Sequence, residues 1–419
     1  MRGTRARARG GRALTLDEVD EPAPRILVAT AMELTRDPRA RRQVAAARAQ
    51  GLEVVGLSGT AGEDPVPLEG VTITRVVTGR AGTFRTAVGG FRRSSAPIRE
   101  LRGLARILRL ARTTRRLVAG GRGLGEFEIV HANDFATLPA AWLLTRRTST
   151  RLVYDAHEVY ASEEVNGPWL YARFVTIVEG FLARRADAVV TVSEPIADEL
   201  VRTLRLPRRP IIVLNAPDRD ERPLERVAAG PLRAVYQGAI GPNWELDDLL
   251  VVAEHAEGVS FTIRVAGADR EALEREVAAR GLAATVKIVP PVAPDRLVDA
   301  LRPFEIGLLV HRAGARSSDL VFPNKIFEYM LAGLAVGSSA LKGLTPLVSE
   351  EEIGVLFEPG DPGELGAILS ELGRDRPRVT AMRERAHRLA LERFHAEAQV
   401  PRLVEAWGLS TTRAEHAAT

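Results

Sequence analysis

The sequence contains no cysteine. This absence excludes a disulfide framework, a thiolate nucleophile and a cysteine-ligated metal site. A chain without cysteine fits a reducing compartment, and we therefore expect a cytoplasmic protein.

Long apolar runs and an export signal are also missing. The stretch nearest to a membrane span, 329–341, is interrupted by glycines and serines and suits a buried helix and strand. The N-terminus is basic up to Arg12, but no apolar segment follows it. We expect no membrane-spanning segment and no signal peptide, and we expect residues 1–22 to form a flexible tail.

Lysine is scarce. The chain has 58 basic residues, and only three of them are lysines: Lys287, Lys325 and Lys342. The formal net charge of +4 is small for a chain of 419 residues. The high isoelectric point therefore reflects the high pKa of arginine, and it does not indicate a nucleic-acid-binding protein.

Short β-branched runs alternate with helical stretches along most of the chain. A parallel sheet with helices on both faces gives this pattern, because its strands are buried on both sides. A turn-rich, charged segment at 215–223 divides the pattern into two halves. We predict an α/β protein of two Rossmann-like, doubly wound domains that face a central cleft. The predicted strands are 25–32, 53–59, 72–77, 127–133, 151–158, 188–194 and 210–217, then 232–238, 261–267, 285–290, 305–311, 334–339 and 354–359.

The domain boundaries follow from these runs. By periodicity alone, the helix near the C-terminus fits equally well as a cap on its own domain or as a return to the first domain. The first strand is not followed by Gly-x-Gly-x-x-Gly, which argues against a dinucleotide cofactor. The predicted segments are a first domain at 23–217, a linker at 218–230, a second domain at 231–390, a C-terminal helix at 391–410 and a flexible tail at 411–419.

The most informative segment is 322–336. Pro323 suits the first position of a helix, and Gly333 suits the position after its last turn. On this helix Lys325 and Glu328 lie three residues apart, opposite the apolar stripe, so both can face a cleft.

The beginning of this helix offers a site for an anion. Backbone N–H groups at Asn324, Lys325 and Ile326, the helix dipole and the charge of Lys325 would together stabilise a diphosphate. Glu328, one turn later, can accept hydrogen bonds from the hydroxyls of a ribose or a hexose. The alternative is an amphipathic helix with an incidental surface ion pair.

Several motifs, taken in their order along the chain, resemble the retaining GT-B glycosyltransferases of family 4 (glycosyl transferases group 1). The resemblance covers roughly residues 25–410, and the order and spacing of the motifs are more specific than any one of them. The matching motifs of the second half are Pro323-Asn324-Lys325-Ile326-Phe327-Glu328-Tyr329-Met330, Ala332-Gly333-Leu334, Tyr236-Gln237-Gly238, Ile353-Gly354-Val355 and Pro359-Gly360-Asp361-Pro362. Those of the first half are 37–43, 130–134, 154–158 and 185–194.

This resemblance implies transfer of a sugar, with retention and without a metal, from a nucleotide-diphosphate sugar to an acceptor hydroxyl. It implies no cofactor, because the nucleotide sugar is a substrate, and it makes the leaving phosphate a suitable base for the incoming hydroxyl. It assigns Glu328 to the donor ribose and Gly238 to the diphosphate, and it favours return of the C-terminal helix to the first domain.

Two positions depart from the family pattern. Leu320 stands where members often have a glutamate that contacts the transferred sugar, and Trp244 stands where an arginine commonly meets the phosphates. We therefore expect the donor phosphates to be met by Lys325 and helix dipoles, or by Arg312 or Arg316 in the preceding loop.

Polar residues end two strands of the first half, at the edge where ligands gather in doubly wound sheets. Asn133 stands where the family often has histidine, and His131 fits a packed core histidine equally well. At 155–158 the alternative is a set of loop residues that satisfy backbone donors. No third ligand accompanies His157 and Glu158, so we expect no metal. The expected catalytic residues are His131, Asn133 and His157, and the expected acceptor-binding residues are Asp134, Asp155 and Glu158.

The segment 91–122 holds ten arginines and a single acid, Glu100. On a helix, its apolar residues form one stripe. One interpretation is a core-facing helix with a solvated basic face. The other is docking onto an anionic membrane surface or a phosphorylated acceptor. The stripe consists of Ile98, Leu101, Leu104, Ala105, Leu108 and Ala111.

Two other functions fit the same fold. A sugar-nucleotide epimerase would need carboxylate bases around the sugar ring, and Leu320 makes this less attractive. A non-catalytic partner of another transferase is supported by Leu320 and Trp244. The sequence does not identify the sugar, the base or the acceptor.

Overall fold

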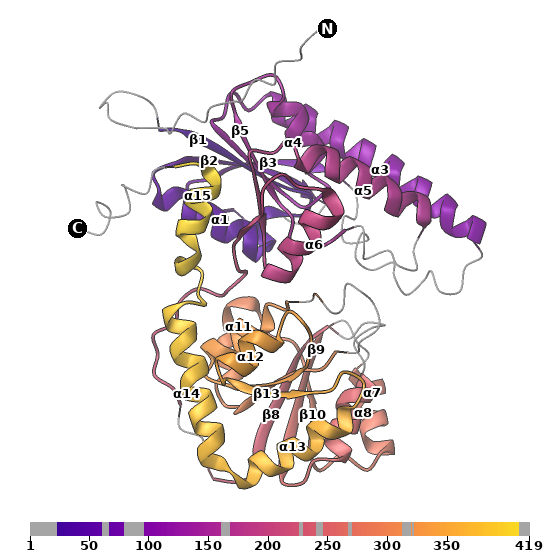
Figure 1. Cartoon of the computed structure of the whole chain (residues 1–419), viewed down its shortest axis with the longest axis vertical. Coiled ribbons are helices and arrows are strands. Elements are labelled where there is room, and N and C mark those ends of the chain that lie inside the picture. The colour runs from indigo at the N-terminus through magenta and orange to yellow at the C-terminus, as the bar shows by residue number, and fades with distance from the viewer. Residues whose placement is uncertain are drawn as a thin grey trace.

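The computed structural model describes residues 23–60, 67–78, 96–160, 168–225, 229–239, 246–266, 270–311, 320 and 322–409. Trp244, Arg312, Arg316 and the two predicted tails lie outside the described residues. The described chain forms two parallel sheets, one above the other in Figure 1. The predicted α/β class with two Rossmann-like domains is confirmed.

The first domain is built on a sheet of seven strands among the described residues, in the order β3-β2-β1-β4-β5-β6-β7. The chain reverses its direction of winding between β1 and β4, and ligands bind at such a switch point. The strands are β1 (Arg25–Thr30), β2 (Glu53–Thr60), β3 (Thr72–Val77), β4 (Ile129–Asn133), β5 (Arg151–Asp155), β6 (Ala188–Thr191) and β7 (Ile211–Ile212). The helices are η1 (Leu34–Arg36), α1 (Pro38–Ala49), α3 (Ala96–Arg122), α4 (Leu138–Thr145), α5 (Trp169–Ala183) and α6 (Glu194–Leu204).

The second domain repeats this architecture with the strand order β10-β9-β8-β11-β12-β13, so its switch point lies between β8 and β11. Its strands are β8 (Leu232–Ala239), β9 (Val259–Ala266), β10 (Val286–Val289), β11 (Ile306–Leu309), β12 (Ala335–Ser339) and β13 (Gly354–Phe357). Its helices are α7 (Leu246–Glu254), α8 (Arg270–Ala279), η3 (Pro294–Arg296), α9 (Leu297–Leu301), α11 (Lys325–Leu331), α12 (Thr345–Glu350), α13 (Pro362–Arg374) and α14 (Arg376–Glu392).

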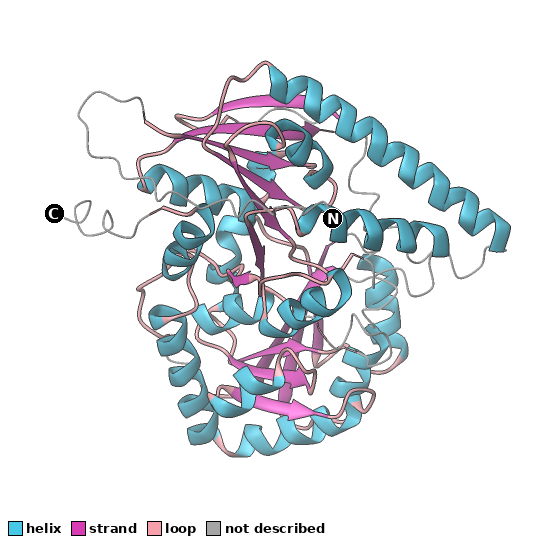
Figure 2. Cartoon of the chain, turned by 45° about the horizontal axis from the view of Figure 1, so that its top comes forward, coloured by secondary structure: helices cyan, strands magenta, loops and turns pink. Residues whose placement is uncertain are grey.

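Helices cover both faces of each sheet (Figure 2). This explains the continuous apolar runs: β4, β11 and β12 are buried along their whole length. Separate apolar clusters form on the two faces of each sheet, as expected for a three-layer arrangement.

The C-terminal segment is not one continuous helix. After α14 the chain is interrupted before η4 (Glu397–Gln399) and α15 (Val400–Trp407). At the interruption, Ala396 N–H donates to Pro217 O at 2.8 Å, and Leu214 N–H donates to Gln399 Oε1 at 3.2 Å. The linker and the returning segment therefore lie side by side between the domains (Figure 1).

Helix α15 packs on the first domain, against α1 and β5–β7. Trp407 is fully buried there, and its Nε1 donates to His131 Nδ1 at 2.9 Å. Arg151 of β5 adds a hydrogen bond from Nε to Ala406 O at 2.8 Å. Residues 276 positions apart thus share one core.

The longest helix in the described part of the chain is α3, with 27 residues. Its length would suffice for a membrane crossing, but its many arginines do not allow one. No helix among the described residues combines the length and the apolar content that a membrane crossing needs.

Trp407→Ala should lower the free energy of unfolding of the first domain by about 3–5 kcal/mol, because it removes a fully buried indole. Trp407→Phe should cost less, since only part of the volume and the hydrogen bond to His131 are lost. Urea denaturation followed by circular dichroism measures both.

The matched control is Arg402→Ala on the exposed side of the same helix, which should change stability by no more than about 0.5 kcal/mol. A Trp407→Ala protein as stable as the wild type would show that α15 does not belong to the core of the first domain.

Candidate functional site

The second domain places a basic and an acidic side chain at its switch point. Lys325 and Glu328 come from α11, and Gly238 comes from the end of β8. The helix ends at Leu331, and Gly333 follows its last turn as predicted, with a φ of +77° that suits glycine. It begins at Lys325, two residues later than predicted, although Ile326 N–H already donates to Pro323 O.

Lys325 lies over the ring of Tyr236, with Nζ 4.7 Å from the ring centroid, and Gly238 leaves room for it. A Cβ at Gly238 would meet Lys325 Nζ at 2.3 Å, and the φ of +151° also favours glycine. Burial lowers the pKa of Lys325 to about 8, although the nearby Glu328 opposes this change.

Glu328 accepts a hydrogen bond from Gln237 Nε2 at 2.9 Å. Burial raises the pKa of Glu328, while Lys325, Arg42 and Gln237 oppose that rise. Arg42 belongs to α1 of the first domain, so a positive charge of the first domain acts on Glu328 of the second. Neither Gln237 nor Arg42 was predicted as a site residue, although both belong to motifs of the resemblance.

The other predicted donor residues divide into two groups. Asn324 is described and exposed just before α11. Arg312 and Arg316 fall outside the described residues. Leu320 packs against the apolar cluster of the first domain, and thus contacts the opposite side of the cleft from its own domain.

In the first domain, three side chains gather beyond the switch point of the sheet. Asp134 follows β4, and its Oδ1 receives hydrogen bonds from His157 Nε2 at 2.9 Å and from the hydroxyl of Tyr160. The φ of Asp134 is +69°, an uncommon conformation for a residue other than glycine. Such strain concentrates at functional sites. Tyr160 was not predicted, and Glu158 is half-buried beside this group.

His157 is held as a cation in this arrangement. Burial opposes its charged form, but Asp134, with a smaller contribution from Asp155, raises the pKa of His157 to about 9. Its Nδ1 lies 4.0 Å from Asp155 Oδ1. Both ring nitrogens therefore face carboxylates, and at neutral pH the imidazolium cannot act as a general base. Asp134 keeps a lowered pKa, despite its burial, because of His157 and Tyr160.

His131, Asn133 and Asp155 lie inside the first domain rather than in the cleft, with exposed fractions of 0%, 1% and 0%. A side chain without exposed surface cannot contact a substrate in this arrangement. We therefore correct their predicted catalytic and acceptor-binding roles. Asn133 and Asp155 end β4 and β5 as expected, and His131 lies two residues before the end of β4, but their side chains point into the layer between the sheet and its covering helices.

These three residues belong to one buried polar network. Arg39 binds Asp155 through Nε at 2.6 Å and Nη2 at 2.8 Å. Gln43 exchanges two amide hydrogen bonds of 2.9 Å with Asn133 and donates to Asp155 at 2.8 Å. His131 Nε2 lies 3.5 Å from Asp155 Oδ2. The pKa of Asp155 is lowered by Arg39 and His131 despite the opposing effect of burial.

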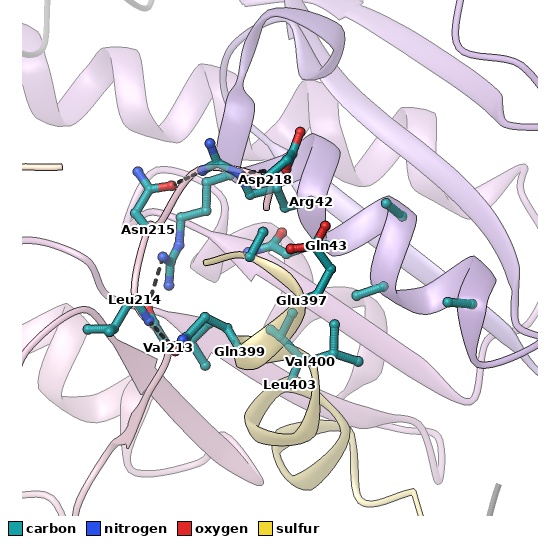
Figure 3. A pocket seen from close by; sticks show the side chains of 15 residues that line it. Arg42, Gln43, Val213, Leu214, Asn215, Asp218, Glu397, Gln399, Val400 and Leu403 are labelled. Atoms are coloured by element: carbon teal, nitrogen blue, oxygen red, sulfur yellow. Dashed lines mark hydrogen bonds and ion pairs between the residues drawn. The ribbon is translucent and has the colours of Figure 1, made fainter. Parts of the chain in front are cut away.

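A cavity of about 260 Å³ lies where the linker and the returning C-terminal segment pass α1 (Figure 3). Its walls are mainly apolar side chains, such as Val213, Val400 and Leu403. Arg42 stands at its edge and bonds to Asn215 Oδ1 at 2.5 Å. Neither Lys325 nor Glu328 lines it, so this cavity is separate from the charged group on α11.

Comparison with protein families matches both halves of the chain. Residues 40–217 match the family Glycosyltransferase Family 4, and residues 233–375 match the family Glycosyl transferases group 1. Among curated proteins, the D-inositol 3-phosphate glycosyltransferase of Rhodococcus jostii is 28% identical over 313 residues, which cover 68% of this chain and 67% of the relative. That of Streptomyces avermitilis is 27% identical, covering 64% and 62%.

Solved structures share the fold at low sequence identity. Sucrose-phosphate synthase from Thermosynechococcus elongatus has a TM-score of 0.68 at 16% identity, covering 94% of this chain and all of that one. The Anabaena protein HepE in complex with UDP and glucose has a TM-score of 0.63 at 16% identity, covering 91% and 98%. An E. coli protein bound with UDP-2-fluoro glucose has a TM-score of 0.67 at 14% identity, covering 92% and 99%.

Asp134→Asn should lower the pKa of His157 from about 9 towards the ordinary value of about 6.5, because burial, which favours the neutral ring, is then opposed only by the smaller contribution of Asp155. Asparagine tolerates the positive φ at this position, so the fold should be kept. NMR titration of the histidine ring protons measures the change, with His157→Gln for assignment.

Tyr160→Phe is the control, since it removes a hydrogen bond to Asp134 but leaves the negative charge. It should leave the pKa of His157 well above 6.5. An unchanged pKa in Asp134→Asn would mean that Asp134 does not hold His157 in its charged form.

Proposed function

We propose, from the premise that this chain belongs to the group 1 glycosyltransferases, that it takes its sugar from a nucleotide-diphosphate donor bound at α11. The observation that carries this proposal is the pairing of Lys325 and Glu328 beside Gly238. A half-buried cation next to a glycine offers an anion both charge and room. A half-buried carboxylate offers acceptors for vicinal hydroxyls.

In this proposal the donor diphosphate lies against Lys325 and Gly238. Lys325 is half-buried, so its charge acts at a lower effective dielectric than that of a fully exposed lysine. The charge that develops on the departing diphosphate is stabilised there, which is the electrostatic form of catalysis. Glu328 holds the nucleoside through the ribose hydroxyls, with Gln237 fixing the carboxylate.

The acceptor is proposed to bind at Asp134. One oxygen of this carboxylate is engaged by His157 and Tyr160, and the other can accept a hydrogen bond from an acceptor hydroxyl. The lowered pKa of Asp134 makes it a better orienting group than a base. The proton of the hydroxyl is therefore proposed to pass to the leaving phosphate.

Transfer with retention, independence from metal and a cytoplasmic location belong to the same proposal. Retention fits a mechanism in which hydroxyl and leaving phosphate lie on one face of the sugar. Within the described ranges, no three histidine, aspartate or glutamate side chains gather as metal ligands. The location rests on the absence of cysteine in the sequence.

Glu328→Gln should weaken binding of a nucleoside diphosphate by roughly 10- to 150-fold, because charge-assisted hydrogen bonds contribute about 1.5–3 kcal/mol each. UDP is the first probe, since two of the compared structures carry UDP or a UDP sugar. Isothermal titration calorimetry with nucleoside, monophosphate and diphosphate measures the loss.

The matched control is Glu384→Gln on the exposed surface of α14, which should bind as the wild type does. Equal affinity of Glu328→Gln and wild type for every nucleoside diphosphate tested would refute the donor site.

Diphosphate affinity should fall by about tenfold from pH 7 to pH 9, because Lys325 has a pKa near 8 in the free protein. Bound phosphate favours the charged lysine and raises its pKa. The lysine contribution is therefore complete below pH 8, and it is lost as the pH rises from there towards the pKa in the complex. Calorimetry across this range measures the decline.

Lys325→Arg serves as the control, because arginine stays charged throughout and should remove the dependence on pH. The affinity for the bare nucleoside should also be independent of pH in this range. A diphosphate affinity that is constant between pH 7 and pH 9 in the wild type would rule out Lys325 as the phosphate partner.

A further inference from the structure

The apolar stripe of α3 faces solvent instead of the core. Leu101 has an exposed fraction of 67%, Leu108 of 57% and Leu104 of 47%. The core-facing side of the helix consists instead of Gly103, Arg106, Leu110, Thr113 and Leu117, all of which are buried. An exposed apolar row of this kind indicates a surface that another body covers.

Basic side chains continue and flank this apolar row. Arg112 and Arg115 are exposed and lie on the same helical face as Leu101 and Leu108, one to two turns later. Exposed Arg102 and Arg109 border it on one side. The single acid of the helix, Glu100, is engaged as the acceptor of hydrogen bonds from the first N–H groups of α5.

Helix α3 extends beyond the sheet. Its 27 residues span about 40 Å, and only the second half contacts strands: Gly120 lies against Leu57 and Val76. In the first half, Gly103 lies against Pro168 and Tyr171 at the beginning of α5. Figure 1 shows α3 and α5 reaching past the sheet together.

The projecting end lies on the cleft side of the domain. Helix α3 follows β3, and a helix after a strand of a parallel sheet begins at the carboxyl edge of the sheet. Asp134 follows β4 at the same edge. The apolar row is thus on the side of the domain where the proposed acceptor site opens.

The beginning of α5 adds a tryptophan to this end. Trp169 has an exposed fraction of 64% and Leu170 of 40%, and the N–H groups of both donate to Glu100 at 2.9 and 3.1 Å. Tryptophan is enriched at the interface between headgroups and acyl chains. An amphipathic helix in an anionic lipid surface places its arginines near the lipid phosphates and its leucines among the acyl chains.

We propose that the projecting end of α3, with Trp169 and Leu170, docks on an anionic lipid bilayer. The leucines insert between the headgroups, and the arginines bind lipid phosphates. A bilayer is favoured as the occupant because the surface combines an apolar row with a charge of one sign. The docking itself does not depend on the proposed function. Its consequence is that the acceptor hydroxyl is presented at a membrane surface, and this consequence rests on the proposed function.

The test is co-sedimentation of the full chain with vesicles of phosphatidylcholine, with and without phosphatidylglycerol. The wild type should bind the anionic vesicles at low salt and release them at high salt. Arg112→Gln/Arg115→Gln should bind roughly 30-fold more weakly, since each basic residue near the surface contributes about a factor of five. Leu101→Ser/Leu108→Ser should also bind more weakly, with its charge unchanged.

The matched control is Arg378→Gln/Arg388→Gln, which removes the same charge from exposed positions of α14 in the other domain. This variant should bind as the wild type does. Lipids brominated in their acyl chains should quench the fluorescence of Trp169 in the wild type. This part of the quenching should be absent in Trp169→Phe.

Three results would overturn the proposal. The first is no binding to anionic vesicles at low salt. The second is binding by Leu101→Ser/Leu108→Ser that equals the wild type, because a purely electrostatic contact would not need the row. The third is a dimer in sedimentation that Leu101→Ser/Leu108→Ser converts to a monomer, which would make a second copy the occupant.

Calorimetry with UDP on the same α3 variants separates this proposal from the proposed function. These variants should keep the diphosphate affinity of the wild type, because α3 and α11 belong to different domains. Loss of vesicle binding with intact UDP binding supports the docking surface. Vesicle binding without binding of any nucleoside diphosphate would refute the donor site and leave the docking in place.

Discussion

The buried carboxylate of Asp155 organises the cleft side of the first domain. An isolated charge in this position would be severely destabilising, so its partners are obligatory. Arg39 provides two charge-assisted hydrogen bonds and a third to Val213 O, which ties α1 to the segment entering the linker. His131 extends the network to Trp407, and hence to the helix that returns from the second domain. One charge thus links the sheet, α1, the linker and the end of the chain.

This network also determines what remains for chemistry. Arg39 neutralises the charge of Asp155 inside the domain, so the carboxylate that remains accessible is that of Asp134. His157 lies between Asp134 and Asp155. The linker and the returning C-terminal segment run side by side next to the 260 Å³ cavity. A change in the angle between the domains would therefore bend both segments together. Leu320 reaches across the cleft to the apolar cluster of the first domain. At this position the chain therefore has an apolar contact between domains.

The alternation of buried runs predicted the strands of the described residues within about three residues at each end, except that β7 is much shorter than expected. Parallel strands buried on both faces leave a clear pattern. The same pattern does not tell which way a residue at a strand end points. His131, Asn133 and Asp155 were placed at the correct edge, yet all three turn inwards, since their partners Arg39, Gln43 and Trp407 are distant in sequence. For α3, the sequence showed the apolar stripe but not whether the stripe faces the core or the solvent. Gly103 and Arg106, which carry little apolar signal, form the packed side because a glycine allows α5 to approach closely.

If the proposed donor site is correct, the charges on α11 favour an intact nucleoside diphosphate over either of its parts. Burial disfavours the charged forms of both Lys325 and Glu328, as the lowered pKa of the one and the raised pKa of the other show. Each charge partly compensates the other, and Arg42 and Gln237 add to the compensation at Glu328. A phosphate alone would satisfy Lys325 and leave Glu328 with a negative group nearby, and a nucleoside alone would engage Glu328 and leave Lys325 desolvated. A ligand carrying both groups compensates the two charges at once, so the binding contributions of its two halves are coupled through the same pair of side chains.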